Sequence, residues 1–236
     1  MADIELTATD GHTFTAHRAD PPGEPLGGVV VIQEIFGVNE HIRAVADRFA
    51  AAGFVAVAPA LFDRVERGVE LGYDSEGMAK GRGMAWELPI EPPLADLAAT
   101  ADALAHELGG PARVGVVGFC YGGMLSAALA SRAPEHLAAA VAYYPSRAAQ
   151  LLTDDRIECP LMIHLGDEDQ GVTVADGQAL AKRWPTAEVH RYEGAGHGFN
   201  CDLRAGYHTH ASARAWDRTV AFLTGHLAGG KPGGHA

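Results

Sequence analysis

The stretch Gly118-Phe119-Cys120-Tyr121-Gly122-Gly123 follows an apolar run at 113–117 and precedes an alanine-rich, proline-free segment at 124–132. The run predicts a buried strand and the segment predicts a helix. A glycine-x-nucleophile-x-glycine pattern between a strand and a helix is typical of a nucleophile elbow, here with cysteine as the nucleophile. A helix N-terminus also favours the thiolate form of a cysteine. We therefore predict that Cys120 is catalytic; the alternative is a buried structural cysteine beside a glycine-rich turn.

Strand and helix patterns alternate on both sides of this stretch. Asp10-Gly11 predicts a hairpin between 4–9 and 13–18. Further strands are expected at 29–32, 54–58, 113–117, 137–143, 161–165 and 187–192, and helices at 40–52, 96–108, 124–132, 173–184 and 210–227. This alternation predicts an α/β fold, a mainly parallel sheet with helices on both faces, in a single domain over residues 1–227.

Two segments depart from the alternation. Residues 59–93 carry glycines, charges and methionines without sustained periodicity, which is typical of an irregular insertion at an active site. Residues 228–236 are rich in glycine and are predicted to be a disordered tail.

The composition narrows the class of protein. The chain has 236 residues, 47% of them hydrophobic, and a formal net charge of −12. This charge argues against binding to nucleic acid or to an anionic membrane surface, both of which need basic patches. No targeting or membrane-spanning segment is visible, and three cysteines without disulfide or zinc spacing suit a reducing compartment, so a cytoplasmic location is expected. We expect no cofactor and no metal, and the sequence carries no signal for the oligomeric state.

A cysteine nucleophile needs a histidine to transfer the proton and an acid to orient that histidine. His197 lies in a glycine-bracketed loop after the last predicted strand, where the backbone can bring an imidazole over the sheet edge. Asp167 and Asp169 both follow the strand at 161–165, where an orienting carboxylate belongs. We favour Asp169 over Asp167, and the alternative role for this carboxylate is helix capping.

Four motifs together resemble the dienelactone hydrolase family of α/β-hydrolases. They are the elbow at 118–123, Gln33-Glu34-Ile35-Phe36-Gly37, the acidic loop at 166–169 and Gly196-His197-Gly198-Phe199. The resemblance extends from about Val29 to the last predicted helix, so it covers most of the chain.

The resemblance implies a triad of Cys120, Asp169 and His197, with Glu34 in contact with the thiol. A carboxylate after a buried strand is costly unless a partner uses it, so Glu34 is a candidate acceptor of the thiol proton once substrate enters. The alternative is a surface acid in a loop. Backbone N–H groups of Ile35 and Tyr121 would form the oxyanion hole.

The chain departs from the family pattern at a position that, in the family, binds the substrate carboxylate. The family places an arginine four residues beyond the triad histidine, and Cys201 stands there instead. Arg204 is a candidate replacement, and a second cation is expected from Arg82, Lys80 or Arg64. Trp86 and either Tyr143 or Tyr144 are candidates to line the pocket. Cys201 is either an inert small residue or a partner for an inhibitory disulfide with Cys120.

These observations predict a hydrolase that cleaves an enol lactone or small carboxylic ester through an acyl-thioester. Enolate leaving groups suit a thiol nucleophile, because a thiolate is itself easily expelled and poorer leaving groups would favour reversal. Two alternatives are a broader carboxylesterase or thioesterase and a non-catalytic scaffold that senses thiols or binds ligands.

Overall fold

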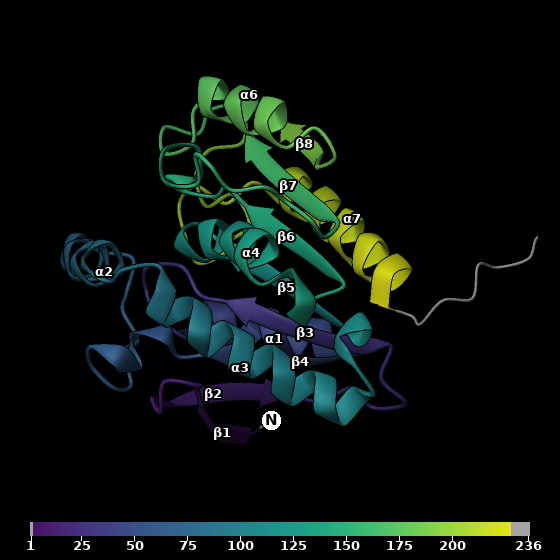
Figure 1. Ribbon diagram of the computed structural model, residues 1–236. Helices are drawn as coiled ribbons and strands as arrows, with labels where there is room; N and C mark the ends of the chain where they lie inside the picture. Colours follow the sequence, from purple (N-terminus) through teal and green to yellow (C-terminus); the bar gives the residue numbers. More distant parts are fainter. Residues whose placement is uncertain (1, 228–236) are drawn as a thin grey trace, which may run out of the picture.

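In the computed structural model, residues 2–227 form one domain around an eight-stranded sheet (Figure 1). The strand order is β1-β2-β4-β3-β5-β6-β7-β8. The strands are β1 (Ala2–Thr7), β2 (Thr13–Ala19), β3 (Gly27–Ile32), β4 (Phe54–Pro59), β5 (Val114–Phe119), β6 (Ala139–Tyr143), β7 (Leu161–Gly166) and β8 (Glu188–Tyr192). The predicted tail at 228–236 lies outside the described residues.

The predicted α/β class is confirmed. β1 and β2 form the expected antiparallel hairpin, β2 pairs antiparallel with β4, and β3 to β8 are parallel. Every residue of β3, β4 and β5 is buried, because helices cover both faces of the sheet.

The main helices are α1 (Glu40–Ala51), α2 (Ser75–Glu87), α3 (Glu91–Leu108), α4 (Tyr121–Arg132), α6 (Val174–Arg183) and α7 (Thr209–Leu227). α3 and α4 lie together in front of the sheet in Figure 1, whereas α1 and α7 pack behind it through the rings of Phe49 and Trp216. Short helical turns complete the chain at η1 (Leu61–Arg64), η2 (Pro111–Arg113), η3 (Pro134–His136) and α5 (Ala148–Leu151). None of the helices between residues 2 and 227 has the length and apolar character needed to span a bilayer.

The expectation that residues 59–93 are irregular was wrong. This segment contains η1 and the thirteen-residue helix α2, and α3 begins at Glu91, five residues before the predicted start at Asp96. The Asp74 side chain caps α2 by accepting a hydrogen bond from the backbone N–H of Gly77 at 2.7 Å. Three glycines inside α2 lower its helix propensity, so packing against the rest of the molecule decides its conformation. α2 lies beyond the carboxyl ends of the parallel strands, over the edge where the site forms (Figure 1).

Candidate active site

Cys120 occupies a strained turn between β5 and α4. Its backbone has φ 55° and ψ −109°, a conformation that L-residues rarely adopt. Gly118 permits the tight turn, because a Cβ there would collide with the carbonyl oxygen of Gly122. The Cys120 N–H donates to the carbonyl oxygen of Tyr143 at 3.0 Å, which ties the turn to the neighbouring strand. The sequence therefore forms the strand–turn–helix geometry that the elbow pattern predicted.

His197 and Asp169 meet at the same edge of the sheet. The imidazole Nδ1 lies 2.9 Å from one carboxylate oxygen of Asp169 and 3.1 Å from the other. The Asp169 carboxylate is buried and accepts hydrogen bonds from the backbone N–H groups of Gly171 at 2.6 Å and Val172 at 2.9 Å. Asp167, the other sequence candidate, pairs with Arg191 instead. Asp169 is thus the carboxylate that orients His197.

The electrostatic surroundings of His197 favour its charged form. Burial lowers the pKa of the imidazole, but the nearby Cys120 sulfur and the hydrogen bond with Asp169 outweigh burial and raise the pKa to about 10. A protonated imidazole beside a sulfur stabilises the thiolate, which is the nucleophilic form of cysteine. The charged imidazole of His197 can therefore stabilise negative charge on the Cys120 sulfur once the thiol has lost its proton.

The thiol itself has a hydrogen-bond partner that the sequence did not indicate. Cys120 Sγ lies 3.2 Å from Ser146 Oγ, and the Ser146 N–H donates to the Cys120 carbonyl oxygen at 3.1 Å. The expected contact between Glu34 and the thiol is not formed as a hydrogen bond, since Glu34 Oε1 meets Arg204 and Oε2 has no partner among the described residues. No local sequence pattern connects Ser146 with the thiol of Cys120.

Glu34 is instead paired with Arg204. The carboxylate is 1% exposed, and its Oε1 lies 3.4 Å from Arg204 Nη1, whereas Oε2 is buried without a hydrogen-bond partner among the described residues. Burial lowers the pKa of Arg204, but the charge of Glu34 and neighbouring groups gives a net rise. The guanidinium lies 5.6 Å from the ring centroids of both Phe36 and Tyr73. Arg204, which lines the same cavity as Cys120, therefore holds a buried carboxylate.

These groups border a cavity of about 430 Å³, a volume suited to a small molecule. Arg82 and Trp86 of α2 line it, four residues apart on one face of the helix. The other side chains and backbone around it come from Ile35, Phe36, Met78, Cys120, Ser146, Arg147, Gln170, Gly171, His197 and Arg204.

The structure separates the remaining substrate-binding candidates. Lys80 pairs with Glu66 and Arg64 pairs with Asp96, so Arg82 is the cation from this segment that reaches the cavity. Tyr144 was expected to contact substrate, and this expectation is corrected: its side chain is fully buried and packs edge-on against His197, with ring centroids 5.0 Å apart. Tyr144 packs against the imidazole ring of His197 and does not line the cavity.

α2 also fixes the loop that contains Ile35. A Cβ at Gly81 would collide with the carbonyl oxygen of Ile35, so the helix backbone lies directly against this loop. Ile35 lies beside Cys120 in the cavity wall, and Tyr121 is the first residue of α4. Their backbone N–H groups come from the two segments that flank the thiol.

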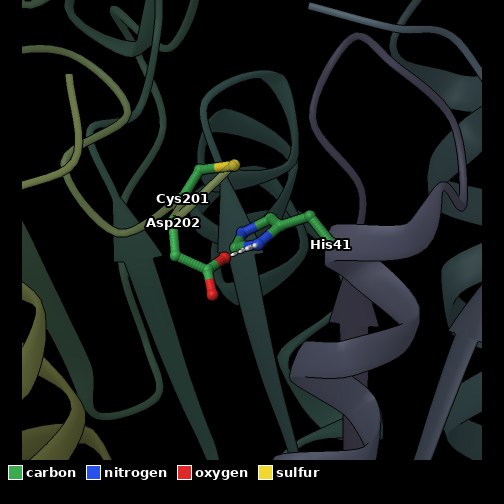
Figure 2. A group of neighbouring side chains, drawn as sticks. All are labelled: His41, Cys201 and Asp202. Atoms are coloured by element: carbon green, nitrogen blue, oxygen red, sulfur yellow. Dashed lines mark ion pairs between the residues drawn. The ribbon is translucent and has the colours of Figure 1, made fainter. Parts of the chain in front are cut away.

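Cys201 belongs to a second cluster. Figure 2 shows Cys201 and Asp202 facing the ring of His41, with an ion-pair contact of 3.4 Å between His41 Nδ1 and the Asp202 carboxylate. One donor atom from each residue lies within 4.8 Å of the others, and thiolate, imidazole and carboxylate are the donor types that Zn²⁺ accepts. The imidazole Nδ1 is already paired with Asp202, whereas the buried Nε2 has no hydrogen-bond partner among the described residues. Burial raises the pKa of the Cys201 thiol to about 11, which keeps it protonated.

The fold and the site define the class of protein. A strained cysteine after the fifth strand, with an aspartate and a histidine in later loops at the same sheet edge, is the arrangement typical of an α/β-hydrolase. The model of the dienelactone hydrolase family matches residues 14–227, and the chain belongs to that family. It is a hydrolase.

Named relatives agree with this assignment. The chain is 41% identical over 204 residues to a putative carboxymethylenebutenolidase of Synechocystis, with 80% of this chain and 82% of the relative covered. It is 32% identical over 225 residues to the carboxymethylenebutenolidase of Pseudomonas putida, with 93% and 94% covered. A putative dienelactone hydrolase from Klebsiella pneumoniae superposes with a TM-score of 0.80 at 30% identity, over 94% of this chain and 99% of that one.

Proposed function

We propose that this protein hydrolyses an enol lactone or a small carboxylic ester through Cys120, His197 and Asp169. The observation that carries the proposal is the meeting of a strained cysteine and a carboxylate-oriented histidine at one cavity. The names of the relatives support a lactone substrate, since carboxymethylenebutenolidases are among them.

The first half of the reaction forms an acyl-thioester. The Cys120 thiolate attacks the carbonyl carbon, and the N–H groups of Ile35 and Tyr121 stabilise the negative charge that develops on the carbonyl oxygen. The carbon–oxygen bond to the leaving group then breaks. The imidazolium of His197 donates its proton to the departing enolate or alkoxide, and Asp169 keeps the ring aligned.

The second half releases the acid. Neutral His197 takes a proton from water, the resulting hydroxide attacks the thioester carbonyl, and the carbon–sulfur bond breaks. The thiolate returns beside an imidazolium, so the initial charge state is restored.

Glu34 offers a route for substrate-assisted activation. In the free protein its carboxylate is paired with Arg204. A substrate carboxylate that binds Arg204 releases Glu34 to accept the thiol proton, while Arg82 and Trp86 contact the rest of the substrate. The resting thiol is then less exposed to oxidation, because a neutral thiol is the less reactive form. The need for free Cys120 also favours a reducing compartment such as the cytoplasm.

The test is steady-state hydrolysis of the two dienelactone isomers and of 4-nitrophenyl acetate, with Cys120→Ala as the control. Dienelactone turnover that disappears in the variant supports the lactone assignment. Turnover of the simple ester alone supports the second candidate, a broader carboxylesterase or thioesterase, which the replacement of the family arginine by Cys201 favours. Intact-mass detection of an adduct on Cys120 tests the thioester. Alkylation of Cys120 without turnover of any ester would indicate a non-catalytic scaffold.

A further inference from the structure

Arg147 lines the cavity, yet nothing in the sequence indicated a role for it. Its guanidinium lies 4.8 Å from the ring centroid of Trp86, so the segment before α5 and helix α2 meet across the cavity through this pair. A guanidinium stacked on an indole keeps its N–H edge free for a ligand, because stacking uses only its face.

The backbone of Arg147 is held in an unfavourable conformation. Its φ is 61°, and among residues 2–227 the only other non-glycine residues with positive φ are Cys120 and Tyr144. Cys120 is the proposed nucleophile and Tyr144 packs on His197, so all three strained residues belong to this site. Strain of this kind persists only where the surrounding structure imposes it, and it is concentrated at functional sites.

The charges of the cavity are unbalanced. Three arginines line it, Arg82, Arg147 and Arg204, and no aspartate or glutamate does, although the whole chain has a net charge of −12. Arg204 is paired with Glu34, whereas Arg82 and Arg147 form no ion pair with any residue in the described range 2–227. Two unpaired cations thus border Trp86, separate from the Arg204–Glu34 pair.

We propose that Arg147 and Arg82 form an anion subsite and that the preferred substrate carries two anionic groups. One carboxylate meets Arg204 and releases Glu34, and the second binds Arg147 and Arg82 beside Trp86. Arg147 is then a specificity-determining residue, and the substrate class is a lactone or half-ester of a dicarboxylic acid that bears a further carboxylate. This inference rests on the proposed function and names its substrate class.

The experiment compares three esters: 4-nitrophenyl acetate, 4-nitrophenyl hydrogen glutarate and 3-carboxy-4-nitrophenyl hydrogen glutarate, which carry no, one and two carboxylates. Arg147→Asn removes the charge and tolerates the left-handed backbone. It should raise KM for the ester with two carboxylates about tenfold, as expected for a lost charge-assisted hydrogen bond. KM for the other two esters should change less than about twofold. Arg147→Lys should recover part of the loss, because the charge remains without the planar stack.

Two controls separate the subsite from the chemistry. Arg156→Asn removes an exposed arginine that does not line the cavity and should leave all three KM values unchanged. Calorimetric titration with glutarate measures anion binding without turnover. Arg147→Asn should raise the Kd for glutarate about tenfold. Equal changes for all three esters, or an unchanged glutarate affinity, would overturn the subsite. Absence of Cys120-dependent turnover with intact, Arg147-dependent glutarate binding would overturn the proposed reaction alone.

Discussion

Residues 2–227 contain two groupings of a buried cysteine, a histidine and an aspartate, and one of them has the features expected of a catalytic site. Cys120 lies with His197 and Asp169, and Cys201 lies with His41 and Asp202 (Figure 2). Both histidines contact their aspartate through Nδ1, at 2.9 Å and 3.4 Å respectively. The residue types are the same, so the difference between the two groupings comes from backbone, burial and charge.

The surroundings give the two groupings opposite electrostatics. Asp169 is buried and held by backbone N–H groups, whereas Asp202 is 68% exposed. The pKa of His197 is raised to about 10, whereas burial lowers the pKa of His41. Cys120 borders a cavity from a strained turn, and Cys201 is fully buried. Proximity of three suitable residues is therefore insufficient: the strained turn, the oriented carboxylate and the cavity distinguish Cys120, the proposed nucleophile, from Cys201.

The sharpest test of this comparison replaces each thiol. Cys120→Ala should lower kcat by about 10⁶-fold, as loss of a triad nucleophile does in other hydrolases. Cys201→Ala should leave kcat within a few-fold, because no step uses its protonated thiol. Both variants are measured on the ester with the highest turnover. A large loss in Cys201→Ala with a normal thermal unfolding curve would contradict the assignment.

The second test replaces each carboxylate. Asp169→Asn should lower kcat by about 10⁴-fold, because the amide no longer stabilises the imidazolium and favours the wrong tautomer. Asp202→Asn is the matched control, and it should leave kcat unchanged. Equal activity of the two variants would show that the orientation of His197 does not depend on Asp169.

The third test reads the histidines directly. At pH 8, ¹⁵N-edited NMR should show His197 as imidazolium and His41 as neutral imidazole, since their pKa values are shifted in opposite directions. In Cys120→Ala the pKa of His197 should fall, because the sulfur that raises it is gone. If both His197 and His41 titrated near the ordinary histidine pKa of about 6.5, the proposed difference between their surroundings would be wrong. Burial lowers the pKa of His41 in the folded protein, so below about pH 6.5 the unfolded chain binds more protons at this residue than the folded one. The free energy of unfolding should therefore decrease as the pH falls through this range because of His41.

The smallest expected effect concerns the turn itself. Gly118→Ala should destabilise the protein by about 1–3 kcal/mol, because the added Cβ collides with the Gly122 carbonyl and the turn must shift. Gly83→Ala on α2 is the matched control: a Cβ there meets no atom within 4 Å, so the change should be neutral or stabilise by about 0.5–1 kcal/mol. Chemical denaturation of both variants measures the difference.

The elements that the sequence predicted correctly are those that depend on local patterns of residues. The β-branched run of β3, the N-cap Asn39 and the glycine-rich elbow each depend on residues close in sequence, and the corresponding elements were predicted to within a few residues. α2 was missed because its glycines weaken the helical signal and its stability depends on contacts with distant segments.

Contacts between distant segments account for the other differences. The Ser146 contact with the thiol and the Arg147 stack on Trp86 join residues that no local pattern connects. An arginine in a left-handed conformation has no sequence signal either, since that conformation favours glycine and asparagine. The resemblance to a family supplied candidate groups for the surroundings of the thiol, but the partner of Glu34 and the orientation of Tyr144 emerged only from packing.

Because Gly81 packs directly against the loop that contains Ile35, helix α2 has two faces that differ in the side chains they tolerate. One face, which includes Gly77 and Gly81, lies against backbone and admits no larger side chain. The other, formed by Met78, Arg82 and Trp86, faces the cavity at four-residue intervals. Substitutions at Met78, Arg82 and Trp86 can thus change substrate preference without disturbing the loop that contains Ile35. The same catalytic framework can in this way serve a series of enzymes with different esters.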